Sequence, residues 1–197
     1  MSILLEVMNK DDIISLPKPA LRERSKKVGH ITPEVKKLIQ DMKDATLDWE
    51  ASRKHEVGVA LAAVQVDQLL RIVVIRNNFD NKNDKTFTVF INPEIIKYEG
   101  VIENDYEGCL SVPFIYGKVP RHTKVRVRAQ DEEGRFFRVK AEGFLARIFQ
   151  HEIDHTNGKV FIDLIKDDPK AFFRLKDDGQ LEAIDYESEV RNNSILW

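Results

Sequence analysis

Residues 144–155 read Phe-Leu-Ala-Arg-Ile-Phe-Gln-His-Glu-Ile-Asp-His, and the rest of the chain is best understood from this stretch outward. Its apolar side chains recur at helical spacing, which predicts a helix that Gly158 ends. His151 and His155 are four residues apart, so one face of that helix presents both imidazoles. Glu152 lies close enough to reach a water held by them. The stretch predicts a metal site, and a helix with two hydrogen-bonded core histidines is the alternative.

Cys109 is the only cysteine of the chain and lies in the sequence Glu-Gly-Cys-Leu-Ser, residues 107–111. One thiolate with two imidazoles makes a three-ligand metal set that leaves a fourth position open for water or substrate. Such a mixed sulfur and nitrogen set suits Zn(II) or Fe(II). A buried, inert cysteine is the alternative, since free cysteines commonly behave as small apolar residues.

The composition limits the classes of protein to which this chain can belong. Of its 197 residues 42% are hydrophobic and 32% are charged, enough for one domain with a real core. The formal charge of −2 does not indicate the basic surface that is typical of nucleic-acid-binding proteins. No apolar run approaches the length of a membrane span. A single cysteine cannot form an internal disulfide, which favours a reducing compartment, so we expect a cytoplasmic protein without direct contact with nucleic acid or membrane.

Other periodic segments indicate the fold class. Thr32-Pro33-Glu34 is typical of a helix start, and the helix is expected to carry Trp49 on its core face. Strands are expected at residues 69–75, 87–91, 95–102, 123–129 and 136–141. Together these patterns predict an α+β domain, with short antiparallel strands packed around a central helix that carries the metal histidines. We expect residues 1–166 to form this domain and residues 167–197 to be an acidic C-terminal extension. About the last twenty residues are expected to pack poorly or to form a helix that docks elsewhere.

Three ordered motifs make the chain resemble the peptide deformylase family. The family's Gly-x-Gly-Leu-Ala-Ala-x-Gln is similar to residues 58–65, its Glu-Gly-Cys-Leu-Ser is identical to residues 107–111, and its Gln-His-Glu-x-Asp-His matches residues 150–155. The resemblance implies metal-dependent hydrolysis of the formyl group from the N-terminal formyl-methionine of nascent polypeptides, with release of formate. It also implies an enzyme that works near the ribosome exit, and we expect a monomer.

The same resemblance implies roles for individual residues. The metal ligands would be Cys109, His151 and His155, with Fe2+ expected in the cell and Zn2+, Ni2+ or Co2+ possible in preparations. Glu152 would move the proton, and the oxyanion would be stabilised by Gln65 and by the backbone N–H of Leu110. From the residues alone, Gln65 could equally be a buried structural amide. The substrate-binding residues implied by the family are Gly58, Val59, Ala60, Arg121, Phe144, Arg147 and Ile148.

Three positions depart from the family pattern. Ala60 and Phe114 stand where glycines are usual, and Arg147 stands where an apolar residue often lines the methionine pocket. Arg147 could point to solvent or could narrow the pocket, and in the second case Arg147→Ile is expected to raise activity. These departures keep open a deformylase-like protein with another formyl substrate or with binding alone. A zinc metallopeptidase, with Asp163 or Glu182 as the third ligand, is a further alternative.

Overall fold

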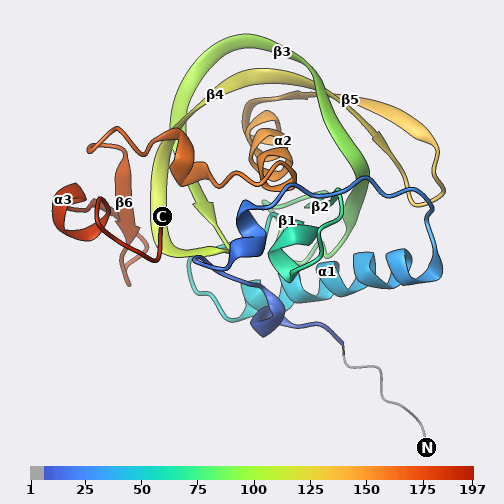
Figure 1. Ribbon diagram of the computed structural model, residues 1–197, viewed down its shortest axis with the longest axis horizontal. Coiled ribbons are helices and arrows are strands. Elements are labelled where there is room, and N and C mark those ends of the chain that lie inside the picture. The colour runs from blue at the N-terminus through green and yellow to red at the C-terminus, as the bar shows by residue number, and fades with distance from the viewer. Residues whose placement is uncertain (1–6) are drawn as a thin grey trace, which may run out of the picture.

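The computed structural model describes residues 7–197 and shows helices packed on an antiparallel sheet (Figure 1). The helices are α1 (Pro33–Ala51), α2 (Gly143–Thr156) and α3 (Tyr186–Glu189), with 3-10 turns η1 (Lys10–Asp12), η2 (Pro19–Arg22), η3 (Ala63–Val66) and η4 (Phe161–Leu164). The strands are β1 (Ala60–Ala62), β2 (Ile72–Arg76), β3 (Phe87–Cys109), β4 (Val112–Gln130), β5 (Phe136–Glu142), β6 (Phe172–Leu175) and β7 (Leu181–Ala183). None of the helices within residues 7–197 is long and apolar enough to cross a membrane. The mixed helical and antiparallel class expected from the sequence is confirmed.

The hairpin of β3 and β4 is the largest feature of the sheet. Strands follow the order β1-β2-β3-β4-β6-β7, and β5 pairs with residues 124–130 of β4, which lies between β3 and β5. Register shifts interrupt the β3–β4 ladder at several points, and such bulges bend a strand pair. The hairpin therefore curves over α2, as Figure 1 shows. Because β2 pairs only with residues 87–91 of β3, the rest of β3 continues beyond β2 as an arch.

Strand β2 separates α1 from α2. Its alternate side chains enter different cores: Ile72 and Val74 pack in the cluster that contains α1, whereas Val73 and Ile75 pack in the cluster that contains α2. A strand buried on both faces reads as a continuous apolar run, which is why residues 69–75 carried a clear strand signal. Helix α2 is thus covered by β2 on one side and by Val125 and Val127 of β4 on another.

The observed elements refine the sequence-based boundaries. Helix α1 starts after its N-cap Thr32, with Trp49 buried as expected. The hairpin of β4 and β5 is also found, with Lys124, Arg126 and Arg128 on its exposed face. The separate strands expected at 87–91 and 95–102 are one strand, β3, because bulges rather than a turn interrupt the ladder.

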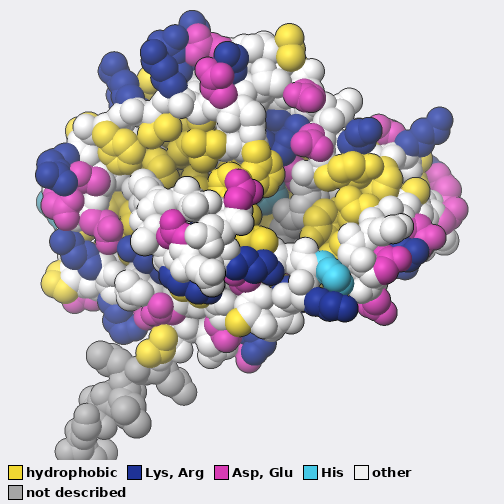
Figure 2. Space-filling model, turned by 180° about the vertical axis from the view of Figure 1, so that it is seen from behind, with side chains coloured by type: hydrophobic (Ala, Val, Ile, Leu, Met, Phe, Trp, Pro, Cys, Tyr) yellow, Lys and Arg dark blue, Asp and Glu magenta, His cyan; other side chains and the backbone are white. Residues whose placement is uncertain are grey.

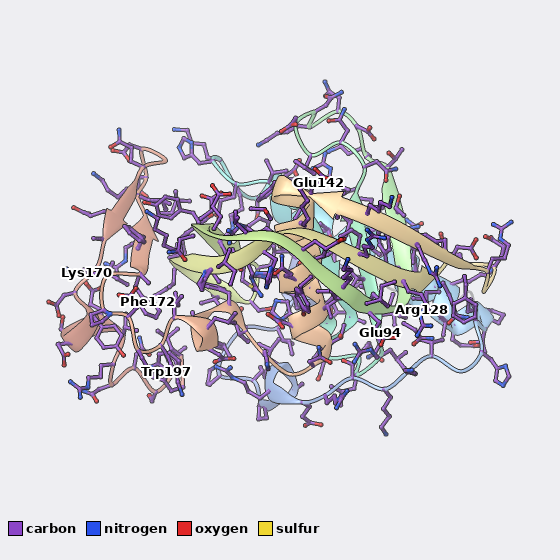
Figure 3. All side chains as sticks on the ribbon, turned by 90° about the horizontal axis from the view of Figure 1, so that it is seen from above. Glu94, Arg128, Glu142, Lys170, Phe172 and Trp197 are labelled. Atoms are coloured by element: carbon purple, nitrogen blue, oxygen red, sulfur yellow. The ribbon has the colours of Figure 1, made fainter. Side chains whose placement is uncertain are left out.

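The prediction that the chain packs poorly near its end is wrong. Strand β6 pairs with residues 115–117 of β4, and Phe172, Val190 and Leu196 are buried in a cluster that also contains Val119 and Phe161. Figure 3 shows Phe172 and Trp197 together at the end of the molecule opposite Glu94 and Arg128. The few apolar residues of this segment suffice because they pack against strand β4 and the cluster around it. Packing does not mark a boundary at residue 166, so that division stays a prediction.

A buried ion pair between Glu50 and Arg76 connects α1 to β2. Both side chains are almost fully enclosed, and Glu50 also accepts a hydrogen bond from the backbone N–H of Gly58 at 3.0 Å. We expect Glu50→Gln to lower the free energy of unfolding by about 3 kcal/mol, because it leaves a buried guanidinium without its counter-charge. Chemical denaturation measures the loss. Glu187→Gln, at the exposed pair with Arg191, is the control and should cost under about 0.5 kcal/mol. Equal losses in the two variants would contradict the argument.

Candidate active site

Helix α2 presents its histidines within the core. The helix begins at Gly143 and ends at Thr156, and Gly158 follows with a φ of +75°, a conformation suited to glycine. A side chain at Gly158 would also meet the carbonyl of Arg22 at 2.5 Å. The expected stop is therefore confirmed. His151 and His155 lie one turn apart with their ring centroids 4.9 Å from each other.

Cys109 reaches the same point from the end of β3. Its Sγ lies 3.3 Å from His155 Nε2, and the ligand atoms of Cys109, His151 and His155 all lie within 4.8 Å of one another. The tight turn to β4 needs Gly108, since a Cβ there would lie 2.6 Å from the ring of Tyr116. Three residues that are distant in sequence thus converge as a metal ligand set requires.

The donor set fits a divalent metal ion. His151 Nδ1 lies 2.9 Å from Glu107 Oε2, a carboxylate acceptor, so Nδ1 carries the proton and Nε2 is the nitrogen that could bind metal. Burial lowers the pKa of His155 well below its usual range and keeps this imidazole neutral, the form that ligates metals. The mixed thiolate and imidazole set belongs to soft or borderline cations.

Glu107 is the centre of a buried ion network. Its carboxylate accepts hydrogen bonds from Arg121 at 2.9 and 3.1 Å and from Arg147 at 2.8 Å, in addition to His151. Arg121 also donates to Asp154 at 2.5 Å. Burial alone would raise the pKa of Glu107, but the hydrogen bonds from His151 and Arg121 outweigh it and lower the pKa to about 2. Glu107 is therefore ionised at neutral pH and fixes the orientation of His151.

The side-chain amide of Gln65 has a defined orientation. Its Oε1 accepts from the backbone N–H of Ala62 at 2.9 Å, so the Nε2 end faces the cysteine turn. Nε2 donates to Ser111 Oγ at 3.1 Å and lies 3.5 Å from Cys109 Sγ. Gln65 is both a structural amide and a donor placed beside the ligand set.

Glu152 is a buried carboxyl with a free oxygen. Its Oε2 has no hydrogen-bond partner among residues 7–197. Buried polar atoms are normally paired, and unpaired ones point to a role with water or ligand. Burial is the main cause that raises the pKa of Glu152 to about 7, and the neighbouring His151 opposes this shift. A carboxyl poised near neutral pH suits proton transfer.

A cavity of about 380 Å³ opens onto this cluster. Figure 2 shows hydrophobic side chains gathered on either side of a hollow in this face of the molecule. Most of the residues expected from the sequence line the cavity: Gln65, Cys109, Leu110, His151, Glu152, Val59, Ala60, Phe144, Arg147 and Ile148. Three of the expected site residues do not line it: the predicted metal ligand His155 and the predicted substrate-binding residues Gly58 and Arg121. Gly58 instead packs against α1, where a Cβ would meet the carbonyl of Thr46 at 2.7 Å.

The three residues that depart from the family pattern lie in different surroundings. Ala60 lies in the cavity wall, and Phe114 is exposed, with a φ of +65° and the guanidinium of Arg53 5.5 Å from its ring. Arg147 does not point to solvent. It is buried and donates to Glu107 and to the carbonyls of Glu103, Asp105 and Val119. These acceptors on β3 and β4 satisfy its guanidinium.

Sequence reasoning missed several residues of the cavity wall. These are Trp49, His55, Glu56, Val57, Phe79, Asp80, Tyr106 and Tyr116. For Trp49 the sequence indicated only a place on the core face of its helix. These residues come from helix α1, loops and strand faces without a motif, so only their three-dimensional positions reveal them. A density of aromatic residues at 106, 114 and 116, flanking the cysteine motif, was the one signal available in the sequence.

The chain is similar in sequence to known proteins. Residues 10–171 match the family model of polypeptide deformylase. A peptide deformylase of Hahella chejuensis is 41% identical over 170 residues, which cover 86% of this chain and 95% of that protein. One of Desulforudis audaxviator is 40% identical over 77% of this chain and 90% of its own length.

Solved structures of peptide deformylases are similar to this chain in fold. The crystal structure of a peptide deformylase from Synechococcus elongatus in complex with actinonin superposes with a TM-score of 0.73 at 32% identity, covering 85% of this chain and 89% of that one. For a peptide deformylase from Legionella pneumophila the TM-score is 0.69 at 41% identity, covering 80% and 85%. The ligand cluster, the cavity, the sequence relatives and the shared fold all lead to one conclusion: the chain belongs to the polypeptide deformylase family.

Proposed function

We propose that Cys109, His151 and His155 hold the divalent metal of this deformylase and that Glu152 is its general base. The reaction is that of the family, the metal-dependent hydrolysis of the N-formyl group of nascent polypeptides. One observation carries the assignment: the three ligand atoms lie within 4.8 Å of one another, and two of the ligand residues, Cys109 and His151, line the cavity together with Glu152. The substrate is the N-terminal formyl-methionine, and the released acid is formate.

The proposed metal in the cell is Fe2+. A thiolate with two imidazoles suits Fe(II) or Zn(II), and the family resemblance favours iron, with Zn2+, Ni2+ or Co2+ as substitutes. When bound, such a cation supplies Lewis acidity that lowers the pKa of water and polarises a carbonyl oxygen. Helix α2 contributes both histidines, and β3 contributes the cysteine.

Glu152 and the two amide donors have complementary tasks. The free oxygen of Glu152 accepts a proton from water and returns it to the leaving amine, for which a pKa near 7 is well matched. The Nε2 of Gln65 and the backbone N–H of Leu110 donate to the formyl oxygen as negative charge develops there. Because Ala62 fixes the other end of the Gln65 amide, this donor needs no reorientation during the reaction.

The apolar part of the cavity suits the methionine side chain. Val59, Ala60, Phe144 and Ile148 offer it an apolar surface. The guanidinium of Arg147 is engaged with Glu107 and backbone carbonyls, so only its aliphatic part is available to a substrate. We therefore propose that Arg147 supports the site through Glu107 rather than restricting the pocket. This assignment favours ordinary formyl-methionine over another formyl substrate.

The proposal extends to the oligomeric state, the cellular location and the partners of the enzyme. We propose a monomeric cytoplasmic enzyme that meets nascent chains near the ribosome exit, without direct contact with nucleic acid or membrane. The single cysteine and the formal charge of −2 support this view. The metallopeptidase alternative is not supported, since Asp163 is engaged by Arg22 and by the backbone N–H of Val160.

Glu152→Gln tests the proposed base. Formate release from a short formyl-Met peptide should fall at least about a hundredfold, because general-base assistance typically contributes this much or more. Metal content should not change, since Glu152 is not among the proposed ligands. Glu182→Gln, an exposed acid on β7, is the matched control and should keep wild-type activity. An active Glu152→Gln enzyme with full metal content would remove Glu152 from the mechanism.

Cys109→Ala separates a deformylase from a metallopeptidase. With the thiolate gone, two imidazoles remain, and we expect the protein to lose most of its metal and its formate release together. Elemental analysis of protein prepared anaerobically measures the first, and a formate assay the second. If Cys109→Ala retained one metal ion per chain, the ligand set proposed here would be wrong.

Arg147→Ile tests the role of the buried arginine. The change removes one partner of Glu107 and the hydrogen bonds that Arg147 donates to three carbonyls, so we expect a loss of about 3 kcal/mol in the free energy of unfolding. kcat/KM for formyl-Met peptides should fall rather than rise, because Glu107 then holds His151 less firmly. Arg138→Ile, at an exposed position of β5, is the control. A rise in kcat/KM would show that Arg147 does restrict the pocket.

A further inference from the structure

The family match ends at residue 171, and the hairpin of β6 and β7 begins directly after it. This hairpin, residues 172–183, lies behind one wall of the cavity. Phe173 is paired with Tyr116 across the β4–β6 ladder, and its ring stands edge-on to the ring of Tyr106 at 5.0 Å. Both tyrosines line the cavity. Residues outside the matched region therefore support residues inside the site.

The turn of the hairpin makes a second contact with the wall. The backbone carbonyl of Asp177 lies 3.0 Å from Nε2 of His55, another cavity residue. Gly179 packs directly on the same imidazole, since a Cβ there would lie 3.0 Å from Nδ1. The contact joins the loop after α1 to the hairpin, which are more than a hundred residues apart in the chain.

A hydrogen bond connects the tyrosines near Phe173 to the loop after α1 that the hairpin turn contacts. The hydroxyl of Tyr116 donates to Glu56 Oε2 at 2.7 Å, and Glu56 follows His55 in the chain. The ring of Tyr116 also rests on Gly108, next to the ligand Cys109. One continuous wall results, in which His55, Glu56, Tyr106 and Tyr116 are fixed to one another and to the hairpin.

This wall belongs to the exposed end of the cavity. Glu152 and His151, at the inner end, are buried, whereas Tyr106 is 40% exposed and His55 is exposed. A formyl group that reaches the proposed metal ligands must lie at the inner end. The peptide residues that follow methionine must then pass the outer end, where aromatic faces and an imidazole are available to them.

We propose that the β6–β7 hairpin is a positioning element that shapes the outer wall of the cavity and sets how the enzyme engages the peptide residues after formyl-methionine. Phe173 and Gly179 are its positioning residues, and Tyr106 and His55 are the groups that meet the substrate. This inference rests on the proposed function. Binding energy from such remote residues of a substrate can raise kcat/KM without any change in the reacting groups.

The test compares a short with a longer substrate. kcat/KM is measured for formyl-Met-Ala and formyl-Met-Ala-Ser-Lys with the metal-loaded wild type, Phe173→Ala and Gly179→Ala. The ratio of interest is kcat/KM for the longer peptide divided by kcat/KM for the shorter one. We expect this ratio to fall about fivefold in both variants, mainly through KM, because binding that is equal in the ground state and the transition state is lost. Phe136→Ala, an exposed phenylalanine on β5, is the matched control and should keep the wild-type ratio.

A double-mutant cycle separates positioning from general stability. If Gly179 acts through His55, then Gly179→Ala should change the ratio little once His55→Ala is present. A readout without turnover is the affinity of formyl-Met-Ala-Ser-Lys for the Glu152→Gln protein, measured by calorimetry with and without Phe173→Ala. The affinity should fall by a similar factor. Should Phe173→Ala fail to fold, Phe173→Leu keeps the packing and removes the edge-on ring contact.

Three outcomes overturn the proposal: an unchanged ratio in both hairpin variants, an equal loss on the two substrates, or fully additive effects of Gly179→Ala and His55→Ala. Failure of the proposed function is distinguishable, since the wild type would then release formate from neither peptide. A wild type that is active with variants of unchanged ratio refutes the role of the hairpin alone.

Discussion

The rest of the structure depends on the hydrogen bonds and ion pairs of the buried Glu107 carboxylate. It joins β3 to β4 through Arg121 and both strands to α2 through Arg147 and His151. Asp154 completes the group through Arg121. Two guanidinium and two carboxylate groups carry no net charge together, so the cluster can be buried without an uncompensated ion. Because this network has no net charge, Cys109 and Glu152 are the groups beside it that could balance the charge of a bound cation.

This network also explains why the bent hairpin is needed. Glu107 and Cys109 are two residues apart on β3, so their side chains leave the same face of the strand. The face is turned toward α2 only because bulges curve β3 and β4 over the helix. A flat hairpin would carry the cysteine away from the two histidines. The geometry of the ligand set is therefore a property of the curvature of the sheet as much as of the helix.

The chemistry at the inner end was predictable from the sequence, whereas the outer end was not. His151, Glu152 and His155 follow from helical spacing, and Cys109 follows from its motif, because a few neighbouring residues determine these positions. The burial of Arg147 could not be foreseen, since its acceptors include backbone carbonyls of Glu103, Asp105 and Val119. Carbonyl positions are set by strand pairing and leave no trace in side-chain patterns. The same reason hid β6, whose four residues become a strand only beside β4.

The two ends of the cavity therefore differ in how the chain constrains them. Any change at Glu107 or Gly108 disturbs the buried network or the ring of Tyr116 and so affects the ligand set directly. The outer wall depends on contacts between the loop after α1 and a hairpin near the end of the chain, which surround the ligand set without entering it. Loops and strand edges tolerate substitution better than a buried ion network does. Differences in substrate range between members of this fold are thus expected to arise at the outer wall, while the charge balance around Glu107 keeps the chemistry of the inner end the same.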